Sequence, residues 1–312
     1  MDKIAFIFPG QGAQSVGMGS DLYNTNEKSK EVFDTANLIL QKDIKKLCFE
    51  GPSEDLQQTV NTQPCIVTTS IAALEALKSK IDIQPDYVAG HSLGEYCALY
   101  CAGVMNLENT LKAIQKRAEL MSKLQQGSMM AVMKATKDQI QDALKVGSEA
   151  GYVDVANYNS PQQVVLTGDT EALKATSEYL LSLGGIKVVP LAVSGAFHSK
   201  FLEGAGNDFE KFIENYELNS AKIPVVTNVD AQATIKAEDF RNKMPKQIYS
   251  SVYWTDTITK MWEDGVRTFV EIGPGKVLNG LVKRIVPEAV VLNVSDNASL
   301  EAALSTLNKE NE

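Results

Sequence analysis

The residues with the clearest chemical potential lie in Gly90-His-Ser-Leu-Gly94, a G-x-S-x-G sequence. The apolar run Tyr87-Val-Ala89 before it predicts a strand, and the helix-forming residues 95–102 follow it. A strand, a sharp turn and a helix are the surroundings in which this motif presents a serine nucleophile. The two glycines leave room where strand and helix cross, because they carry no Cβ atom. We therefore expect Ser92 to be a nucleophile, with N–H groups of the helix N-terminus directed at the space above it, where an oxyanion could sit.

A serine nucleophile needs a base, and the chain contains two histidines, His91 and His198. Side chains of neighbouring residues diverge at such a turn, so His91 is a poor partner for Ser92 and is expected to pack nearby. His198 ends a glycine-containing loop and is the remaining candidate for the base. The order of serine before histidine fits an α/β-hydrolase-like arrangement. No carboxylate is evident to orient the imidazole, and a backbone carbonyl could hold its second ring nitrogen instead.

Two other glycine-rich loops resemble nucleotide-binding motifs, but neither has all the residues that its motif requires. Gly10-Gln-Gly12 follows a predicted strand at 3–8, but Ser15 stands where a dinucleotide fingerprint has its third glycine. This loop could instead bring backbone N–H groups, or the Gln11 amide, beside Ser92. Gly273-Pro-Gly-Lys276 lacks the first glycine of a P-loop and its Ser or Thr, and we interpret it as a turn between strand and helix.

Composition limits the remaining classes of function. The chain has 312 residues, 44% of them hydrophobic, and a formal net charge of −9. The negative charge and the absence of a basic stretch argue against nucleic-acid binding. No signal-peptide pattern opens the chain, and no run of 18 apolar residues suggests a membrane span. The four cysteines form no C-x-x-C pair and are expected to be reduced, buried thiols of a cytoplasmic protein without a metal.

Elements that would position these residues are predicted on both sides of a central segment. The expected helices are 27–49, 64–80, 95–102, 200–216, 237–250 and 254–263, and the expected strands are 3–8, 87–89, 223–228, 267–272 and one near 290. A further helix is expected after Asn106, a plausible N-cap, with Leu111, Ile114, Ala118 and Met121 on its apolar face. Arg117 falls off that face, so the pattern alone favours a solvated helix arginine.

The order of predicted strands and helices changes in the central segment, residues 126–195. Strands at 129–133, 153–157, 163–166 and 186–189 and helices at 136–146 and 171–183 follow one another in the order βαββαβ. This is the ferredoxin-like order, and such a unit can form an inserted subdomain. We therefore predict an α/β chain with a large domain at 1–125 and 196–312 and a small subdomain at 126–195.

Four motifs together resemble one family. They are Phe8-Pro-Gly-Gln-Gly-Ala-Gln14, Gly90-His-Ser-Leu-Gly-Glu-Tyr96, Gly195-Ala-Phe-His-Ser199 and Glu271-Ile-Gly-Pro-Gly-Lys276. The chain resembles the malonyl-CoA:acyl-carrier-protein transacylases from about residue 4 to about residue 285. The resemblance implies an α/β-hydrolase-like large domain with a ferredoxin-like insertion, in agreement with the element order.

The resemblance also implies a mechanism for the serine and histidine. Ser92 would take malonyl from coenzyme A as an ester and pass it to the phosphopantetheine thiol of a carrier protein, in a ping-pong reaction. His198 would be the base in each half-reaction. The backbone N–H groups of Gln11 and Leu93 would form the oxyanion hole.

Further residues gain roles from the resemblance. Arg117 would bind the malonyl carboxylate, because a planar guanidinium can donate two parallel hydrogen bonds to it. Met121 would line the acyl pocket, and the main-chain carbonyl of Gln247 would orient the histidine. Gly-Ala-Phe-His198 is similar to the signature of malonyl-selective polyketide acyltransferases, and Phe197 would crowd a methyl branch on the acyl group.

The implied activity is malonyl transfer for fatty acid biosynthesis. A free-standing malonyl-selective polyketide acyltransferase is the alternative, and a serine hydrolase or a non-catalytic binding module are others. The expected partners are malonyl-CoA and acyl carrier protein, with no nucleic acid, no membrane and no second copy of the chain. Coenzyme A enters as a substrate, and neither a metal nor a bound cofactor is expected.

Overall fold

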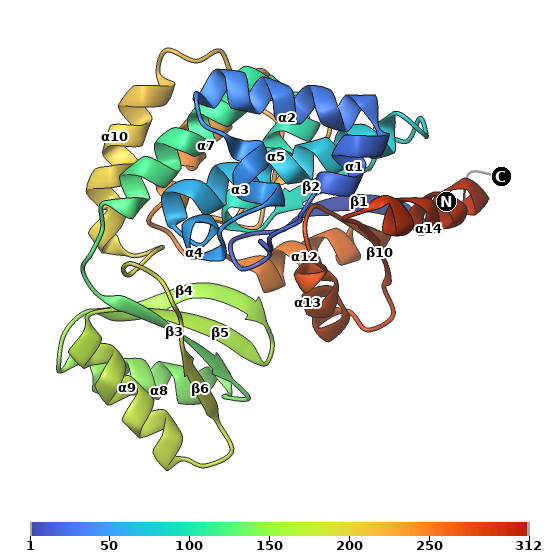
Figure 1. The fold of residues 1–312 in the computed structure, drawn as a ribbon. Coiled ribbons are helices and arrows are strands. Elements are labelled where there is room, and N and C mark those ends of the chain that lie inside the picture. Colours follow the sequence, from blue (N-terminus) through green and yellow to red (C-terminus); the bar gives the residue numbers. More distant parts are fainter. Residues whose placement is uncertain (1, 311–312) are drawn as a thin grey trace.

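A computed structural model describes residues 2–310, which build two units on separate sheets (Figure 1). The larger sheet has the strand order β10-β9-β1-β2-β7-β8, in which every neighbouring pair is parallel except β7 and β8. Its strands are β1 (Lys3–Phe8), β2 (Tyr87–Gly90), β7 (Val225–Val226), β8 (Ala233–Thr234), β9 (Val266–Ile272) and β10 (Val290–Val294). Mixed α/β architecture is thus confirmed.

Helices cover both faces of this sheet. Phe6 and Phe8 of β1 belong to the hydrophobic core beneath one helical layer, whereas Ala5 and Ile7 belong to the core on the opposite face. This alternation is the two-residue period of a strand, and burial on both faces explains the continuous apolar run of β1. The helices are α1 (Ser20–Thr25), α2 (Glu27–Leu40), α3 (Ile44–Phe49), α4 (Ser53–Leu56), α5 (Thr59–Lys78), α6 (Glu95–Cys101), α7 (Leu107–Ser122), α10 (Glu203–Ile213), α11 (Ala237–Gln247), α12 (Trp254–Glu263), α13 (Val277–Ile285) and α14 (Asn297–Glu310).

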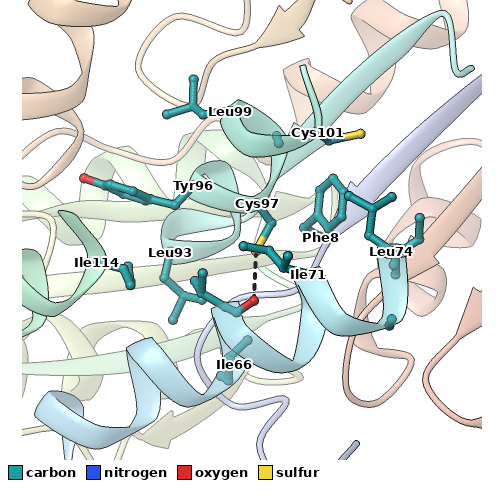
Figure 2. Close-up of a cluster of buried hydrophobic side chains, with 14 of the residues drawn as sticks. Phe8, Ile66, Ile71, Leu74, Leu93, Tyr96, Cys97, Leu99, Cys101 and Ile114 are labelled. Atoms are coloured by element: carbon teal, nitrogen blue, oxygen red, sulfur yellow. Dashed lines mark hydrogen bonds between the residues drawn. The ribbon is translucent and has the colours of Figure 1, made fainter. Parts of the chain in front are cut away.

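Helix α6, which follows the serine turn, lies in the middle of the larger core. Figure 2 shows Cys97 of α6 facing the backbone of α5, within a cluster of buried side chains that also includes Phe8 of β1. Cys97 donates its S–H to the Val67 carbonyl at 3.8 Å. Because α6 is packed on several sides, the turn in front of it has a rigid support.

Three sequence predictions in this unit were wrong in extent. The helix expected at 27–49 is divided into α2 and α3, because Gln41 takes a left-handed φ of 49° and the Asp43 side chain caps a new helix. Helix α5 begins at Thr59, five residues before its predicted start, and contains Pro64. The strand expected at 223–228 is reduced to the two residues of β7, since the chain turns at 227–232 to pair with β8.

The smaller unit is formed by the central segment. Its elements are β3 (Ser128–Met133), α8 (Lys137–Ser148), β4 (Val153–Ser160), β5 (Gln163–Gly168), α9 (Thr170–Ser182) and β6 (Lys187–Pro190). The sheet order is β4-β5-β3-β6, all antiparallel. Thr136 and Gln139 form a capping box at the start of α8.

The two units are joined by more than the two connecting chains. Val252 of the large unit donates its N–H to the Ala156 carbonyl at 2.8 Å and accepts from the Tyr158 N–H at 2.9 Å. These bonds attach the long strand β4 to the loop between α11 and α12. Within residues 2–310, none of the helices combines the length and apolarity needed to cross a membrane.

Candidate active site

The G-x-S-x-G turn is as tight as its glycines suggest. Ser92 has a left-handed φ of 52°. A Cβ atom on Gly90 would lie 2.0 Å from the Gly94 carbonyl carbon, and one on Gly94 would lie 2.3 Å from the Phe8 oxygen. Neither position can therefore hold a side chain without moving backbone. The turn presents the Ser92 hydroxyl at the end of β2, next to the loop that follows β1.

His198 is hydrogen-bonded to this hydroxyl. The Ser92 Oγ to His198 Nε2 distance is 2.8 Å, and His198 Nδ1 lies 3.1 Å from the Gln247 carbonyl and 3.0 Å from the Ser250 carbonyl. Because carbonyl oxygens only accept, Nδ1 carries the proton and Nε2 is the acceptor. Two backbone carbonyls thus occupy the position that a carboxylate takes in a Ser-His-Asp triad.

The imidazole is kept neutral by its surroundings. Burial is the main cause, and the nearby positive charge of Arg117 the second, of a His198 pKa that is lowered to about 3. His198 as a whole is 6% exposed. Near neutral pH, His198 is therefore present as an acceptor for the Ser92 proton.

Arg117 points into the same site and is 1% exposed. Its Nη2 donates to Ser92 Oγ at 3.0 Å and to Gln247 Oε1 at 3.1 Å, and its Nη1 donates to Gln63 Oε1 at 2.7 Å. No ion pair between Arg117 and a carboxylate occurs within the described residues. The pattern-based interpretation of a solvated arginine was wrong, because α2, α5, α6 and α10 pack around α7 and bury more than one of its faces.

The side chains of Gln63 and Gln247 complete the polar part of the site. Gln247 Nε2 donates to the Ser92 carbonyl at 2.6 Å, while its Oε1 accepts from Arg117. Sequence reasoning assigned a role only to the main chain of Gln247 and none to Gln63. A weak signal for Gln63 existed, since Asn61-Thr-Gln63 places polar residues at the start of a helix that is otherwise rich in apolar ones.

A small cavity opens in front of the serine. Its volume is about 110 Å³. Ser92, His198 and Arg117 line it together with four predicted residues, Gln11, Leu93, Met121 and Phe197. His91, which was expected nearby, also lines it, as do five residues that were not predicted, namely Gln63, Met129, Asn157, Leu191 and Val193. Met129 and Asn157 belong to the smaller unit, so the cavity lies where the two sheets meet.

The His91 ring contacts residues other than Ser92. Its Nε2 lies 2.8 Å from Asn159 Oδ1, and its ring packs edge-on against Trp254 with a centroid distance of 5.5 Å. Burial lowers the pKa of His91. This placement agrees with the expectation that His91 packs beside the site while His198 contacts Ser92.

The arrangement suits covalent acyl transfer. A hydroxyl that donates to a neutral imidazole can attack an acyl carbon, and a buried cation 3.0 Å from that hydroxyl can hold an acyl group that bears a negative charge. Among residues 2–310 there is no cluster of three or more His, Cys, Asp or Glu side chains that could hold a metal ion.

Comparison with known proteins agrees with this chemistry. A family model described as the acyl transferase domain matches residues 5–311. The chain is 39% identical over 316 residues to the malonyl CoA-acyl carrier protein transacylase of Bacillus subtilis (strain 168), with 100% of this chain and 99% of that protein covered. The crystal structure of a malonyl CoA-acyl carrier protein transacylase from Clostridium perfringens superimposes with a TM-score of 0.94 at 38% identity, covering 99% and 98% of the two chains. A malonyl-transacylase solved with a type II PKS acyl-carrier protein superimposes with a TM-score of 0.93 at 36% identity, covering 97% and 99%.

Proposed function

The chain belongs to the acyl transferase domain family, and we propose that its Ser92 carries a malonyl group from coenzyme A to an acyl carrier protein. The chain is an acyltransferase that acts on malonyl-CoA and acyl carrier protein, as its relatives' names state for them. One observation supports the choice of malonyl most directly. Arg117 is a buried guanidinium that has no carboxylate partner among the described residues and lies 3.0 Å from Ser92 Oγ.

In the first half-reaction, His198 Nε2 takes the Ser92 proton while Oγ attacks the thioester carbon of malonyl-CoA. The oxyanion of the tetrahedral intermediate accepts hydrogen bonds from the backbone N–H groups of Gln11 and Leu93, both of which line the cavity. Collapse of the intermediate breaks the C–S bond, and the imidazolium returns its proton to the departing thiolate. Malonyl-Ser92 and free coenzyme A result.

In the second half-reaction, the phosphopantetheine thiol of the carrier protein gives its proton to His198 and attacks the malonyl ester. The C–O bond to Ser92 breaks, and the imidazolium protonates Oγ. The Gln247 and Ser250 carbonyls support both steps, because they accept from Nδ1–H and stabilise the imidazolium that forms each time.

Arg117 connects substrate choice to the strength of the base. A malonyl carboxylate can accept from two guanidinium N–H groups in one plane, which acetyl cannot do. The carboxylate also offsets the positive charge of Arg117, and that charge is the second cause of the low pKa of His198. Binding of malonyl therefore raises the pKa of His198 and makes it a better base when the substrate is in place.

The remaining acyl contacts are apolar. Phe197 and Met121 line the cavity and are both buried. A volume of about 110 Å³ suits a short acyl group, and a methyl branch beside Phe197 would have to displace packed side chains. We therefore propose that malonyl is preferred over methylmalonyl.

We propose that the larger unit, residues 1–125 and 196–312, is an α/β-hydrolase-like domain and that residues 126–195 form a ferredoxin-like subdomain. The mostly parallel sheet with its serine turn after β2 supports the first assignment. The βαββαβ order with the sheet order β4-β5-β3-β6 supports the second. The four cysteines are free and buried, in keeping with the proposal of a reducing, cytoplasmic location.

For the pathway we propose fatty acid biosynthesis. The similarity to a malonyl-transacylase solved with a type II PKS acyl-carrier protein favours a polyketide system as the second candidate. Comparing kcat/KM for a fatty-acid carrier and a polyketide carrier from the same organism separates the two candidates.

Intact-protein mass spectrometry tests the transfer itself. After brief mixing with malonyl-CoA, the protein is expected to gain one malonyl group, and adding a phosphopantetheinylated carrier should move that mass to the carrier. Ser92→Ala is the control and should gain nothing. Decay of the gained mass to free malonate, with none on the carrier, would identify a hydrolase, and a malonylated Ser92→Ala protein would refute the serine mechanism.

A further inference from the structure

The backbone of the nucleophile is held by two side chains from outside the turn. The Ser92 N–H donates to Asn228 Oδ1 at 2.8 Å, and the Ser92 carbonyl accepts from Gln247 Nε2 at 2.6 Å. Ser92 needs such support, because a left-handed φ of 52° is unfavourable for a residue with a Cβ atom. Gln247 also contacts Arg117 and His198, and its Nε2 donates to Asn228 Oδ1 at 3.4 Å, so the two supporting side chains are bonded to each other.

Asn228 spans the turn with one amide group. Its Nδ2 donates to the Gly90 carbonyl at 2.7 Å, while its Oδ1 accepts from the Ser92 N–H. Gly90 is the last residue of β2, so the asparagine connects the end of the strand to the nucleophile two residues later. The side chain is fully buried, and both halves of its amide are used. Because it both donates and accepts, the Asn228 amide fixes the distance between the Gly90 carbonyl and the Ser92 N–H, which a single donor or acceptor could not do.

The backbone of Asn228 is tied to the other end of the turn. Its N–H donates to Glu95 Oε2 at 2.7 Å, and Glu95 is the first residue of α6. Its carbonyl accepts from the Tyr253 N–H at 3.0 Å. Strand end, nucleophile and helix start are thus all bound to one residue, which lies about 140 positions away in the sequence.

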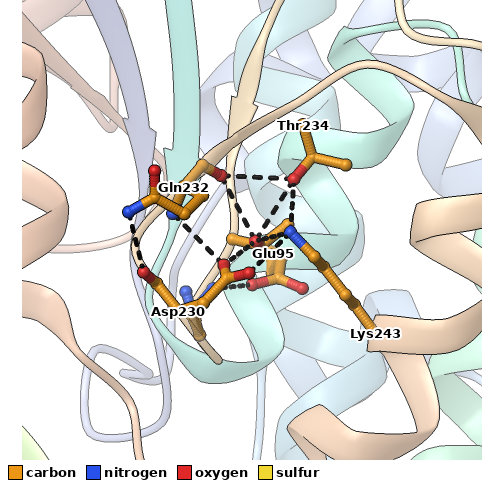
Figure 3. Close-up of polar contacts among 7 residues, drawn as sticks. Glu95, Asp230, Gln232, Thr234 and Lys243 are labelled. Carbon is orange, nitrogen blue, oxygen red and sulfur yellow. Dashed lines mark hydrogen bonds and ion pairs between the residues drawn. The ribbon is translucent and has the colours of Figure 1, made fainter.

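A polar cluster braces the segment that carries Asn228. Figure 3 shows Lys243 of α11 reaching the turn between β7 and β8, beside Glu95. Its Nζ forms an ion pair with Asp230 at 2.8 Å and donates to Thr234 at 2.7 Å and to Thr227 at 3.2 Å. Because Thr227 directly precedes Asn228, this cluster limits the movement of the asparagine backbone.

We propose that Asn228 is a positioning residue that holds Ser92 in its attacking geometry, with Glu95 as the anchor of its backbone. The proposal rests on Ser92 being the nucleophile. Without the bridge, the Ser92 backbone can relax from its left-handed conformation, and Oγ then moves away from His198 Nε2. A displacement of about 1 Å in a reacting atom can cost about 100-fold in rate, whereas the acyl pocket and Arg117 stay in place to bind substrate. The loss is therefore expected in the rate of acylation and not in KM.

The experiment compares two asparagine variants. Asn228→Leu keeps a similar shape and removes both bonds across the turn. Asn26→Leu is the matched control, because Asn26 is also a buried asparagine that accepts from backbone N–H groups, at Lys28 and Ser29, and donates to Ser79 far from the site. The readouts are the rate of malonyl-enzyme formation at saturating malonyl-CoA, KM, the melting temperature, and the labelling rate of Ser92 by a fluorophosphonate.

Asn228→Leu is expected to slow acylation and labelling by about 100-fold with KM changed by less than about threefold. Asn26→Leu is expected to lower the melting temperature and leave both rates unchanged. Equal rates for the two variants at a temperature where both are folded would overturn the proposal, as would a loss confined to KM. Fluorophosphonate labelling is independent of malonyl-CoA, so it tests Asn228 even if the wild-type protein takes up no malonyl, which would refute the proposed function instead.

A second variant covers the case in which leucine prevents folding. Asn228→Asp retains the acceptor for the Ser92 N–H and loses the donor to the Gly90 carbonyl. It is expected to recover part of the rate, with a loss of about 10-fold, since one of the two bonds survives. Wild-type rates in Asn228→Asp, with its melting temperature lowered, would reduce Asn228 to a stabilising role and overturn the proposal.

Discussion

Replacing Arg117 by alanine is expected to reduce malonyl transfer strongly and selectively. Arg117 is 1% exposed, and its Nη2 lies 3.0 Å from Ser92 Oγ, so the variant loses a buried cation beside the position of a bound acyl group. A hydrogen bond to a charged group contributes about 1.5–3 kcal/mol, and the guanidinium can donate two. The expected loss is therefore about 3–6 kcal/mol, or about 10²- to 10⁴-fold in kcat/KM for malonyl-CoA.

Acetyl-CoA provides the internal comparison for this variant. Acetyl has no carboxylate to lose, and removing the Arg117 charge removes one cause of the low pKa of His198. The kcat/KM for acetyl-CoA is therefore expected to stay constant or rise. The assay measures both substrates against one carrier protein, so that the ratio of the two kcat/KM values reports selectivity and cancels any general loss of active protein.

Two further variants sharpen the interpretation. Arg117→Lys keeps the charge without the planar pair of donors and is expected to recover only a small part of the malonyl rate. Arg241→Ala removes an arginine that donates to the Ile213 and Tyr216 carbonyls outside the site, and it should leave the ratio unchanged. Equal losses for malonyl and acetyl in Arg117→Ala would refute carboxylate binding and leave Arg117 as a residue that only supports the site.

Three other predictions follow from burial and close packing. Because the pKa of His198 is about 3, kcat/KM for malonyl-CoA should stay flat from pH 8 to about pH 5, and an acid limb near pH 6.5 would contradict this. Burial raises the pKa of Glu271 from 4.5 to about 7, so the folded state binds this proton more tightly than the unfolded state does. The free energy of unfolding should therefore fall by about 3 kcal/mol as the pH rises from about 4.5 to about 7. Urea unfolding at pH 5 and pH 8 should show this fall in the wild-type protein and not in Glu271→Gln. The same fall in both proteins would exclude the contribution of Glu271. Gly94→Ala would place a Cβ 2.3 Å from the Phe8 oxygen and should cost about 3 kcal/mol in urea unfolding, whereas Gly204→Ala, with open space around it, should cost nothing; equal effects would contradict the packing argument.

Much of the candidate active site could be predicted because its signals are local. Strand, G-x-S-x-G and helix are consecutive in the sequence, and the steric demands of one turn determine where Gly90 and Gly94 must stand. His198 was reached by elimination, since the chain has only two histidines and the other is adjacent to Ser92. The βαββαβ order of the smaller unit was likewise visible, because a change of hydrophobic period marks each element.

The extent of some elements depended on interactions that no pattern records. The break between α2 and α3 requires a left-handed Gln41, which is a polar residue of ordinary helix propensity. The segment 223–228 has the composition of a strand. It forms only two residues of strand, because the chain then turns to pair with β8 and Asn228 donates its side-chain amide to the Gly90 carbonyl. In both places tertiary contacts outweighed local preference.

Sequence alone indicated the candidate nucleophile, its turn and the candidate base, because these depend on residue type and on spacing within a few positions. Tertiary structure decided which side chains surround them. Arg117 looked solvated from its helical pattern and is buried because other helices cover a second face of α7. Gln63 and Asn228 reach Arg117 and Ser92 across 54 and 136 positions of sequence, respectively. Contacts over such separations arise only when packed helices and parallel strands bring distant segments together. Residue spacing along the chain therefore does not predict them.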